Sequence, residues 1–580
     1  MTFLSLPHHL LTLRHSSYKT LFPYAPRRHR LMTSSSIYSS ILSPEMKTGA
    51  MNSSLVAHLS LLSLDDSKED AEELAATPIF TQAVHEYGSS LKTATKKPFA
   101  QYGLLAGIIE NTSAARNSPA FSPKDPRLFF NTSTPSSVFI CGSQGSGKSH
   151  TLSCILENCL MESKASVLPR PLTGIVFHYD PWVSASRGSP CEAAYLASAQ
   201  KISVRVLCPP TNVKQIEGIY SKLPNVRVET LRINQSDLNT KRMMDLMAIS
   251  SVQGGMPLYM HVVQRILKDL RIEQQEKETT FNYREFKQRL MDAALTPAQL
   301  QPLQQRLETL ESFMVKEQVV HISKKKAIQA QGKANSWEPK TGQLTIIDLS
   351  CPCVTEETAC SLFNICLSLF LEQSPQVGRV VALDEAHKFM TNTAECQVLT
   401  ESLLSNIRLQ RHLGLRVIIS TQEPTISPKL LDLCSVTIVH RFHSPDWLQS
   451  LKKHLAGASL SLLSKGQHIT NGISNGDDKV NGIRSVCENP NDVAAELFGK
   501  IVALRRGEAL LFCPSGIVGV RTTATKTENG SPASKDWADT HEGNVAKEAS
   551  PQLIKLSYGH LKIRVRGRIT QDGGRSILAV

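Results

Sequence analysis

Short apolar runs alternate with longer amphipathic stretches from residue 137 onward. The runs are rich in Val and Ile and are bounded by polar residues, as expected of parallel strands that are buried on both faces. The predicted strands are 137–141, 174–179, 203–208, 344–349, 379–383, 416–420 and 435–439. Helical patterns lie between several of them, including 150–160 and 399–413. The alternation predicts an α/β fold, a three-layer sandwich with a mainly parallel sheet.

Residues 262–335 interrupt this pattern with apolar positions at helical spacing. Gln, Glu, Lys and Arg fill the other faces, so the stripe predicts core-facing helices rather than a functional surface. The stripe consists of Phe286, Leu290, Met291, Ala294, Leu295, Leu303, Leu307, Leu310 and Phe313. We therefore expect a helical insertion between strands of the sheet.

The remaining segments suggest a core flanked by less patterned regions. Residues 65–74 are acidic and predict a helix, 111–126 read as a linker, and 52–130 show no run of strands. The expected organisation is a basic Ser-rich tail (1–50), a weakly patterned region (51–130), a core (131–520) with a flexible loop (456–490), a disordered linker (521–550) and a basic C-terminal strand or tail (551–580).

The N-terminus is basic: its first 44 residues contain no Asp or Glu. This composition is typical of a mitochondrial transit peptide. A disordered tail or an overlong gene model, with Met32, Met46 or Met51 as the true start, fits equally well. Otherwise we expect a nuclear or cytoplasmic protein.

Composition is that of an ordinary globular chain with a basic bias. The 580 residues are 41% hydrophobic and 20% charged, and the formal net charge of +13 favours an acidic partner such as nucleic acid. The 13 cysteines lack zinc-site spacing, and many fall in apolar runs, which suggests buried, reduced thiols in an intracellular protein. No apolar run is long enough to span a bilayer.

The most specific motif is G-x-x-x-x-G-K-S at residues 142–149, between a predicted strand and a predicted helix. Glycines let the loop backbone wrap around phosphates, Lys148 reaches the β- and γ-phosphates, and the Ser149 hydroxyl can ligate Mg²⁺. The alternative, a chance Gly-rich turn, carries little weight in this strand–helix context. The expected nucleotide contacts are Gly142, Ser143, Gln144, Gly145, Ser146, Gly147, Lys148, Ser149 and His150.

A second strand, 379–383, ends in Asp384 and Glu385. In a Walker B arrangement Asp384 holds Mg²⁺ and Glu385 polarises the attacking water as general base. Ordinary surface acids at a strand end are the alternative, which the nearby phosphate loop makes weak. Two acids predict hydrolysis as well as nucleotide binding.

Three further polar residues are candidates. Gln422 follows a strand and can sense the γ-phosphate or position water, although a polar strand end without a role is a real alternative. Arg408 and Arg411 lie on one helix face, where an arginine can serve a neighbouring subunit's site. On periodicity alone, two solvated arginines are the better interpretation.

The order of these motifs resembles the HerA/FtsK-type ATPases, ring-forming RecA-like P-loop motors that pump DNA or protein. The segments that carry the resemblance are the phosphate loop, Ile346–Ser350, Leu383–His387, Arg411–Leu415, Ile419–Pro424 and Ile438–Arg441. The resemblance covers roughly residues 137–520. It implies Lys148 and Ser149 as phosphate and Mg²⁺ ligands, Asp384 and Glu385 as completing the site, Gln422 as sensor and Arg411 as arginine finger, with Arg441 as a weaker second candidate.

The chain also departs from this family. An N-terminal β-barrel is expected, and 52–130 show no strands for it. Asp384-Glu-Ala-His387 spells a DEAH box without the helicase arginine motif, and 463–467 mimic a transporter signature in the wrong order. Asp180 ends a strand and is either close to the nucleotide or a plain strand-end acid.

The C-terminal run 561–569 alternates apolar and basic residues. Lys562, Arg564, Arg566 and Arg568 are expected on one face of a strand. A sheet-edge strand with a solvated basic face is one interpretation. The other is a docked tail that presents charge to a phosphate.

Together these patterns predict an enzyme, a Mg²⁺-dependent P-loop ATPase that binds ATP and Mg²⁺ and self-associates as a ring, with a hexamer as one option. The first hypothesis for its purpose is a DNA translocase. The alternative is a nucleotide-gated regulatory or scaffold ATPase that translocates nothing.

Overall fold

A computed structural model describes residues 66–91, 97–111, 125–181, 188–247, 258–315, 318, 334–454, 490–521 and 551–573. The chain divides into two units, Met1–Glu69 and Asp70–Val580, and almost all of the described residues belong to the second. The predicted transit peptide lies outside the described residues, as do nearly all of the predicted loop at 456–490 and the predicted linker at 521–550, and most of the predicted linker at 111–126.

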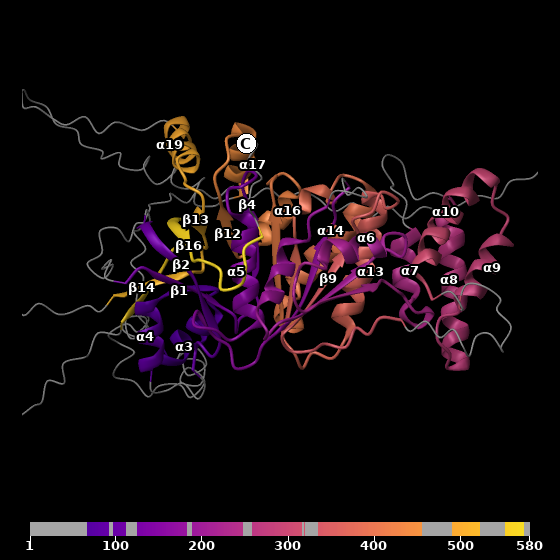
Figure 1. The fold of residues 1–580 in the computed structure, drawn as a ribbon, viewed down its shortest axis with the longest axis horizontal. Coiled ribbons are helices and arrows are strands. Elements are labelled where there is room, and N and C mark those ends of the chain that lie inside the picture. The colour runs from indigo at the N-terminus through magenta and orange to yellow at the C-terminus, as the bar shows by residue number, and fades with distance from the viewer. Residues whose placement is uncertain are drawn as a thin grey trace, which may run out of the picture. The chain divides into compact units, whose positions relative to one another are not determined.

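Eight parallel strands form one side of the sheet, from β12 to the edge strand β8 (Figure 1). Their spatial order is β12-β4-β11-β10-β6-β9-β7-β8, and every neighbouring pair is parallel. Their bounds are β4 Ser137–Cys141, β6 Thr173–His178, β7 Ser203–Cys208, β8 Val226–Thr230, β9 Gln343–Asp348, β10 Arg379–Leu383, β11 Leu415–Thr421 and β12 Val436–Val439. All seven predicted strands are present. Only β8 was missed, because the alternating VRVET of an outer strand lacks the apolar run of its buried neighbours.

Helices cover both faces of this sheet. In β4, Val138 and Ile140 belong to one core, and Phe139 and Cys141 belong to the other, as the two-residue period of a strand requires. The first core holds helices α5 (Lys148–Leu160), η3 (Glu192–Ser198) and α6 (Val213–Tyr220). The second holds α7 (Thr240–Met247), α13 (Glu356–Glu372), α14 (Ala394–Arg408) and α16 (Pro428–Leu433). The predicted three-layer α/β sandwich is thereby confirmed.

Shorter and more peripheral elements complete the fold. They are α3 (Asp66–Ala76), α4 (Gln82–Ser90), β5 (Ser166–Val167), η4 (Gln235–Asp237), η5 (Ala386–Lys388), α15 (Gln410–Leu413), α17 (Pro445–His454) and α19 (Pro490–Val502). The helix predicted at 65–74 corresponds to α3. The one predicted at 399–413 is two helices, α14 and α15, interrupted at Leu409.

Three consecutive helices, α8 (Leu258–Lys277), α9 (Tyr283–Met291) and α10 (Pro297–Phe313), occupy much of the predicted insertion. They lie together beside α7 (Figure 1). Thr296 and Pro297 start α10, where proline costs no helical hydrogen bond. Most of the predicted apolar stripe is buried in the second core. Ala294 is exposed, because α9 has already ended at Met291.

A second set of strands extends the sheet beyond β12, where β13 (Glu508–Phe512) pairs antiparallel. The order continues β13-β16-β2-β3-β1-β14-β15, with β5 paired to β2. Their bounds are β1 Ile79–Thr81, β2 Tyr102–Asn111, β3 Arg127–Asn131, β14 Ile517–Arg521, β15 Gln552–Lys555 and β16 Leu561–Val565. The expectation that 52–130 contains no strands was therefore wrong. β1 is very short and β2 contains glycine, so neither shows a clear strand pattern.

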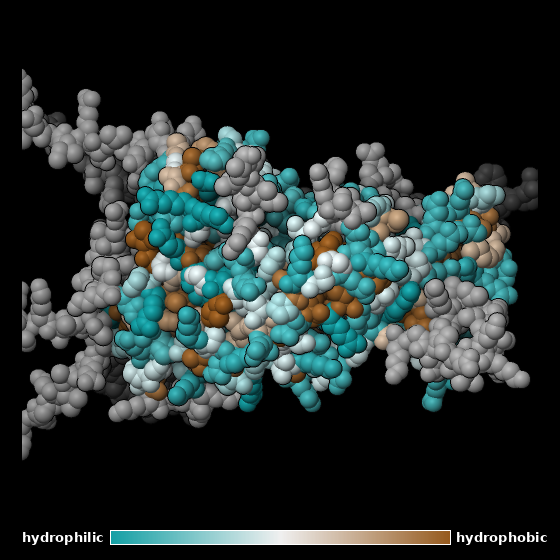
Figure 2. Space-filling view, viewed as in Figure 1, coloured by the Kyte–Doolittle hydropathy of each residue, from teal (hydrophilic) through white to brown (hydrophobic). Residues whose placement is uncertain are grey.

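The surface gives no sign of a membrane segment. No helix in the described part of the chain is long and apolar enough to cross a bilayer. On the face shown in Figure 2, apolar residues form separate patches within a mostly hydrophilic surface. The described cysteines are free, and Cys141, Cys208, Cys366 and Cys513 are buried as expected, whereas Cys434 is partly exposed.

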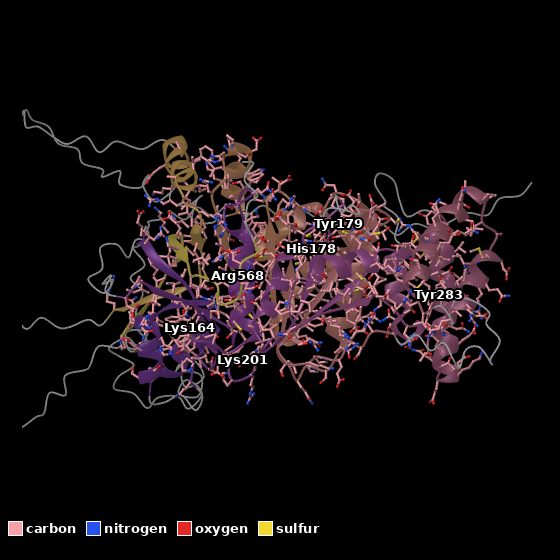
Figure 3. The ribbon with its side chains drawn as sticks, in the orientation of Figure 1. Lys164, His178, Tyr179, Lys201, Tyr283 and Arg568 are labelled. Atoms are coloured by element: carbon pink, nitrogen blue, oxygen red, sulfur yellow. The ribbon has the colours of Figure 1, made fainter. Side chains whose placement is uncertain are left out.

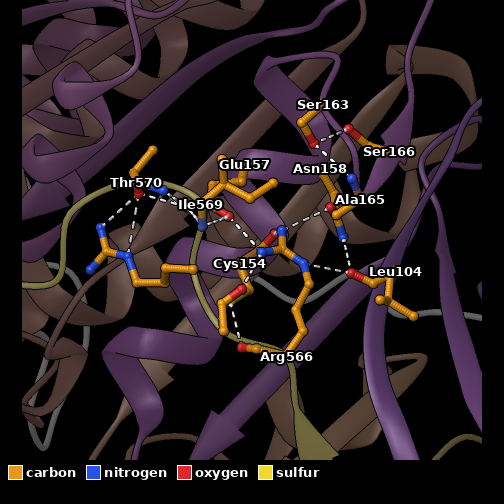
Figure 4. A network of polar contacts seen from close by, with 12 residues as sticks. Leu104, Cys154, Glu157, Asn158, Ser163, Ala165, Ser166, Arg566, Ile569 and Thr570 are labelled. Carbon is orange, nitrogen blue, oxygen red and sulfur yellow. Dashed lines mark hydrogen bonds and ion pairs between the residues drawn. The ribbon is translucent and has the colours of Figure 1, made fainter.

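The C-terminal segment docks on the core by burying its charges (Figure 4). β16 ends at Val565, so Arg566 leaves the strand and reaches α5. Its Nη1 lies 2.7 Å from Oε2 of Glu157, which is fully buried. Nε donates to the carbonyl of Leu104 at 2.8 Å, and the backbone N–H and hydroxyl of Thr570 also donate to Glu157. The buried carboxylate is thus paired and hydrogen-bonded, which is what its burial requires.

The other three tail charges are also paired within the chain. Arg564 Nη2 lies 3.0 Å from Glu508 Oε1, and Lys562 Nζ lies 3.8 Å from the other oxygen of Glu508. Arg568 contacts Glu192. Both interpretations of the tail therefore need correction: β16 is paired on two sides rather than at a sheet edge, and each of the four basic side chains is paired with an acid of the same chain, although Arg564 is 60% exposed.

Removing Arg566 tests how much this docking stabilises the fold. Arg566→Ala leaves Glu157 charged and buried, so we expect a loss of about 3–5 kcal/mol in the free energy of unfolding, measured by urea denaturation. The control is Arg564→Ala, whose side chain is 60% exposed and should cost no more than about 1 kcal/mol. Equal effects of the two substitutions would contradict a structural role for the Arg566–Glu157 pair.

Candidate active site

The phosphate loop joins β4 to α5 with the backbone shape that its glycines permit. Gly142, Gly145 and Gly147 have φ of +152°, +71° and +116°. A Cβ on Gly142 would lie 2.6 Å from His440 Cβ and 2.8 Å from Ser146 Oγ, so this position needs glycine for space as well. Gln144 and Gly145 are exposed at the tip, which leaves the concave backbone open to a ligand.

Lys148 and Ser149 begin α5 directly after this loop. Lys148 is buried, and its Nζ donates to the carbonyl of Ser143 at 3.2 Å. Burial lowers the pKa of Lys148, while the carboxylates of Glu385 and Asp384 oppose that shift. The charged ammonium is therefore held between the loop and the two predicted acids. The Ser149 side chain is partly exposed.

His150 has a different role from the one predicted. Its Nε2 lies 2.8 Å from the carbonyl oxygen of Arg566, and its Nδ1 lies 3.9 Å from Asp572. The ring thus contacts the C-terminal segment, while its position at the start of α5 keeps the backbone near the loop.

A buried histidine, His440, helps to hold the phosphate loop in place. His440 Nδ1 lies 3.0 Å from the carbonyl oxygen of Glu508, and Nε2 lies 2.9 Å from the Thr151 hydroxyl. Burial lowers the pKa of His440 to about 4, so the ring is neutral at physiological pH. Gly507 also donates its N–H to the Ser146 carbonyl at 3.3 Å. Sequence reasoning missed these supports because they join segments far apart in the chain.

The strand order brings the predicted catalytic residues to one edge. β11 lies between β4 and β10, so Gln422 after β11 falls between the phosphate loop and the two acids. Gln422 Nε2 donates to Glu385 Oε2 at 3.2 Å. Glu385 has φ of +50°, which is unfavourable for a residue with a side chain, and such strain is concentrated at functional sites.

His387 completes this cluster and was not among the predicted site residues. Its Nδ1 lies 3.4 Å from Glu385 Oε2 and accepts the backbone N–H of Gln422 at 3.4 Å. Burial lowers the pKa of His387, with Glu385 opposing. This histidine is part of the Asp-Glu-Ala-His string. The string was compared with a helicase box, and that comparison gave the histidine no role at the site.

Asp384 is almost completely buried and has two neighbours that the sequence did not suggest. Its Oδ2 lies 3.6 Å from His178 Nδ1 and 3.7 Å from Cys191 Sγ. Figure 3 labels His178, which ends β6. Burial opposes ionisation of Asp384, but His178, Cys191 and Lys148 together hold its pKa below the usual value. Asp384 is therefore an anion.

These residues fit a magnesium nucleotide. Asp384 Oδ1 is buried with no hydrogen-bond partner in the described part of the chain, which leaves a lone carboxylate oxygen for a cation or its water. The glycine cradle, Lys148 and the hydroxyl of Ser149 lie at the same edge of the sheet. They are the groups that hold phosphates and Mg²⁺ in phosphate loops.

The remaining predicted residues, three arginines and Asp180, lie in different parts of the structure. Arg411 is exposed on α15, at the start of β11, and so at the opposite end of that strand from Gln422. It cannot reach the site of its own chain. Arg408 is likewise exposed. The Arg441 carbonyl accepts the Ser143 N–H at 2.9 Å, so Arg441 lies beside the loop. Asp180 Oδ1 lies 3.4 Å from Lys388 Nζ.

Comparison with known proteins yields only distant structural matches. No protein-family model matches the chain, and no curated protein matches it. The genome packaging NTPase B204 of Sulfolobus turreted icosahedral virus 2, in complex with ATP-gammaS, is 12% identical, with a TM-score of 0.23, over 65% of this chain and 92% of that one. VirB4 of Thermoanaerobacter pseudethanolicus is 13% identical, with a TM-score of 0.32, over 66% of this chain and 88% of that one.

At these identities and TM-scores the similarity carries no functional argument. The assignment of a P-loop α/β fold rests on the strand order and on the geometry of the phosphate loop.

Proposed function

We propose that this protein is a Mg²⁺-dependent ATP hydrolase of the HerA/FtsK type that works as an oligomer. The observation that carries the proposal is the contact between Gln422 and Glu385, at the sheet edge that also holds Lys148 and Asp384. A site that only binds nucleotide needs neither a strained glutamate after the metal-binding acid nor an amide that orients it.

Each residue has a distinct task in the proposed reaction. The loop N–H groups and Lys148 hold the β- and γ-phosphates, and Ser149 and Asp384 hold the cation, which neutralises charge on the phosphates. Glu385 accepts a proton from the attacking water, and Gln422 fixes the orientation of its carboxylate. Buried Lys148 is not fully solvated before the nucleotide arrives, so its charge acts at full strength on the phosphates.

Self-association follows from the position of Arg411. An exposed arginine far from its own chain's phosphate loop can complete only the site of a neighbour. We propose a ring in which Arg411 of one subunit faces the γ-phosphate held by the next. An arginine supplied in this way stabilises charge in the transition state and can raise the rate by about 10³-fold or more.

The charge of the chain is relevant to whether such a ring would move a polymer, and which one. The net charge of +13 supports DNA as a partner. The second candidate, a regulatory ATPase without translocation, is favoured by one observation: each of the four basic tail residues is paired with an acid of the same chain, Lys562 and Arg564 with Glu508, Arg566 with Glu157 and Arg568 with Glu192.

Two substitutions separate binding from hydrolysis. Lys148→Ala should abolish ATP binding, because no other described cation reaches the loop interior. Glu385→Gln should bind ATP with near-normal affinity but lose about 10²–10⁴-fold in turnover, because the amide cannot accept a proton. Binding is measured with a fluorescent ATP analogue and turnover by phosphate release. An active Glu385→Gln variant would exclude Glu385 as the general base.

The arginine acts between subunits if inactive variants complement one another. Arg411→Ala and Glu385→Gln should each be inactive alone. Mixed after dissociation and reassembly, they should regain part of the activity, because some interfaces then carry both wild-type residues. Arg408→Ala serves as the control, since it removes a neighbouring exposed charge. Failure of the mixture to recover would contradict a finger in trans.

The DNA hypothesis predicts a stimulated and salt-sensitive ATPase. We expect duplex DNA to raise the rate at low salt and the effect to fall steeply as salt rises, since phosphate contacts release counterions. The measurement is ATP turnover with and without duplex across a salt series, with Glu385→Gln as the blank. A rate that DNA leaves unchanged at low salt favours the regulatory ATPase.

A further inference from the structure

Three buried side chains from separate segments converge beside the phosphate loop. His178 ends β6, Asp384 follows the neighbouring strand β10, and Cys191 lies immediately before η3. One ligand atom from each, a ring nitrogen, a carboxylate oxygen and Sγ, lies within 4.8 Å of both others. Their exposed fractions are 8%, 2% and 0%. They form a compact set of one nitrogen, one oxygen and one sulfur.

Hydrogen bonding accounts for this set only in part. His178 Nδ1 and Asp384 Oδ1 are both buried without a hydrogen-bond partner within the described ranges. The thiol of Cys191 donates to Asp384 Oδ2 at 3.7 Å, and the 3.6 Å between His178 Nδ1 and the same oxygen is long for a hydrogen bond. Buried polar atoms are rarely left without a hydrogen bond, and coordination of an ion is one recognised role for such atoms.

The spacing fits a tetrahedral cation. Zinc binds sulfur at about 2.3 Å, nitrogen at about 2.0–2.1 Å and carboxylate oxygen at about 2.0–2.2 Å. Around a tetrahedral centre these lengths separate nitrogen from oxygen by roughly 3.4 Å and sulfur from oxygen by roughly 3.6 Å. The observed separations are 3.6 Å for His178 Nδ1 to Asp384 Oδ2 and 3.7 Å for Cys191 Sγ to the same oxygen.

The types of the three ligand atoms indicate which class of cation the site would bind. Mg²⁺ and Ca²⁺ take oxygen ligands almost exclusively, so a thiol and an imidazole point away from them. Cysteine, histidine and aspartate are together typical of zinc and neighbouring transition metals. Three protein ligands leave a fourth position for water.

We propose that His178, Cys191 and Asp384 form a binding site for a transition-metal dication of the zinc class. On binding, the Cys191 S–H bond and one ring N–H bond of the His178 imidazolium break, both protons leave to solvent, and bonds from sulfur and from the ring nitrogen to the metal form without oxidation or reduction. The thiolate and the carboxylate then balance the two positive charges, and His178 binds as the neutral imidazole.

A second layer of hydrogen bonds holds Cys191 in position. The Cys191 N–H donates to the Tyr220 hydroxyl at 3.0 Å, and that hydroxyl donates to Asp348 Oδ2 at 2.6 Å. Asp348 is itself fixed by the Ser350 N–H at 3.0 Å. Such outer contacts orient ligands and strengthen metal binding. This chain of hydrogen bonds therefore fixes the position of Cys191.

The site has a consequence for turnover, and this part rests on the proposed function. Asp384 cannot serve both cations at once, so a zinc-class ion bound here withdraws the carboxylate that Mg²⁺–ATP requires. The site would then act as an inhibitory metal sensor, occupied when the phosphate loop is idle.

The test uses Co²⁺ as a spectroscopic probe on the full-length protein without nucleotide. Thiolate-bound Co²⁺ gives a sulfur-to-cobalt charge-transfer band in the near-ultraviolet, which Zn²⁺ should abolish by displacement. Cys191→Ser should remove the band, and His178→Ala should weaken Co²⁺ binding by at least about 10-fold. Cys360→Ser is the matched control: Cys360 is a buried thiol whose Sγ lies 3.0 Å from that of Cys396, at a place away from Asp384 where two thiols meet.

Each outcome decides the metal site. A band that persists in Cys191→Ser, or the absence of a band in the wild-type protein, overturns it. Circular dichroism of each variant shows that it is folded, and His178→Ala keeps the thiol in case Cys191→Ser is not. In a second arm, Zn²⁺ should inhibit ATP turnover at saturating Mg²⁺, and competition with Mg²⁺ should be measurable. A protein without ATPase activity would overturn the proposed function, while the Co²⁺ titration would still decide the metal site.

Discussion

The candidate site depends on the register of three parallel strands. Because β11 pairs with β4 on one side and β10 on the other, Thr421 stands beside Cys141, and Ile419 stands beside Leu383. β4 and β11 therefore end at the same level, β10 ends two residues earlier, and the polar residues that follow the three strands emerge at a common edge. A shift of one residue in either pairing would move Gln422 away from Glu385 and would turn every buried Val and Ile to the opposite face.

The local sequence pattern was sufficient to predict the parallel strands and the phosphate loop. Strands buried on both faces show as apolar runs, and the phosphate loop and the paired acids are contiguous strings, so fold class and most site positions could be predicted from sequence alone. The elements that escaped are those defined by partners distant in sequence. β1 pairs with β14, β2 pairs with β16, β3 lies between β1 and β2, and nothing local marks β1 as a strand.

Distance along the chain also explains the errors in assigning roles to side chains. Arg566 and Arg568 look like surface charge in the sequence, but their acids, Glu157 and Glu192, lie hundreds of residues away. Glu157 itself sits in an amphipathic helix where an exposed position was the natural assumption, and it is fully buried. His178 and Cys191 could not have been linked to Asp384, because three unrelated positions carry no common spacing until the sheet is formed.

The supports of the phosphate loop also bear on how the protein is made. The loop residues leave the ribosome long before the segments that hold them: His150 contacts Arg566, 416 positions later, and His440 is held by Glu508. A nascent chain can therefore form β4 and α5 early but cannot fix the loop between them until these later segments have been made. Competence to bind nucleotide would then depend on segments that are synthesised long after the loop itself.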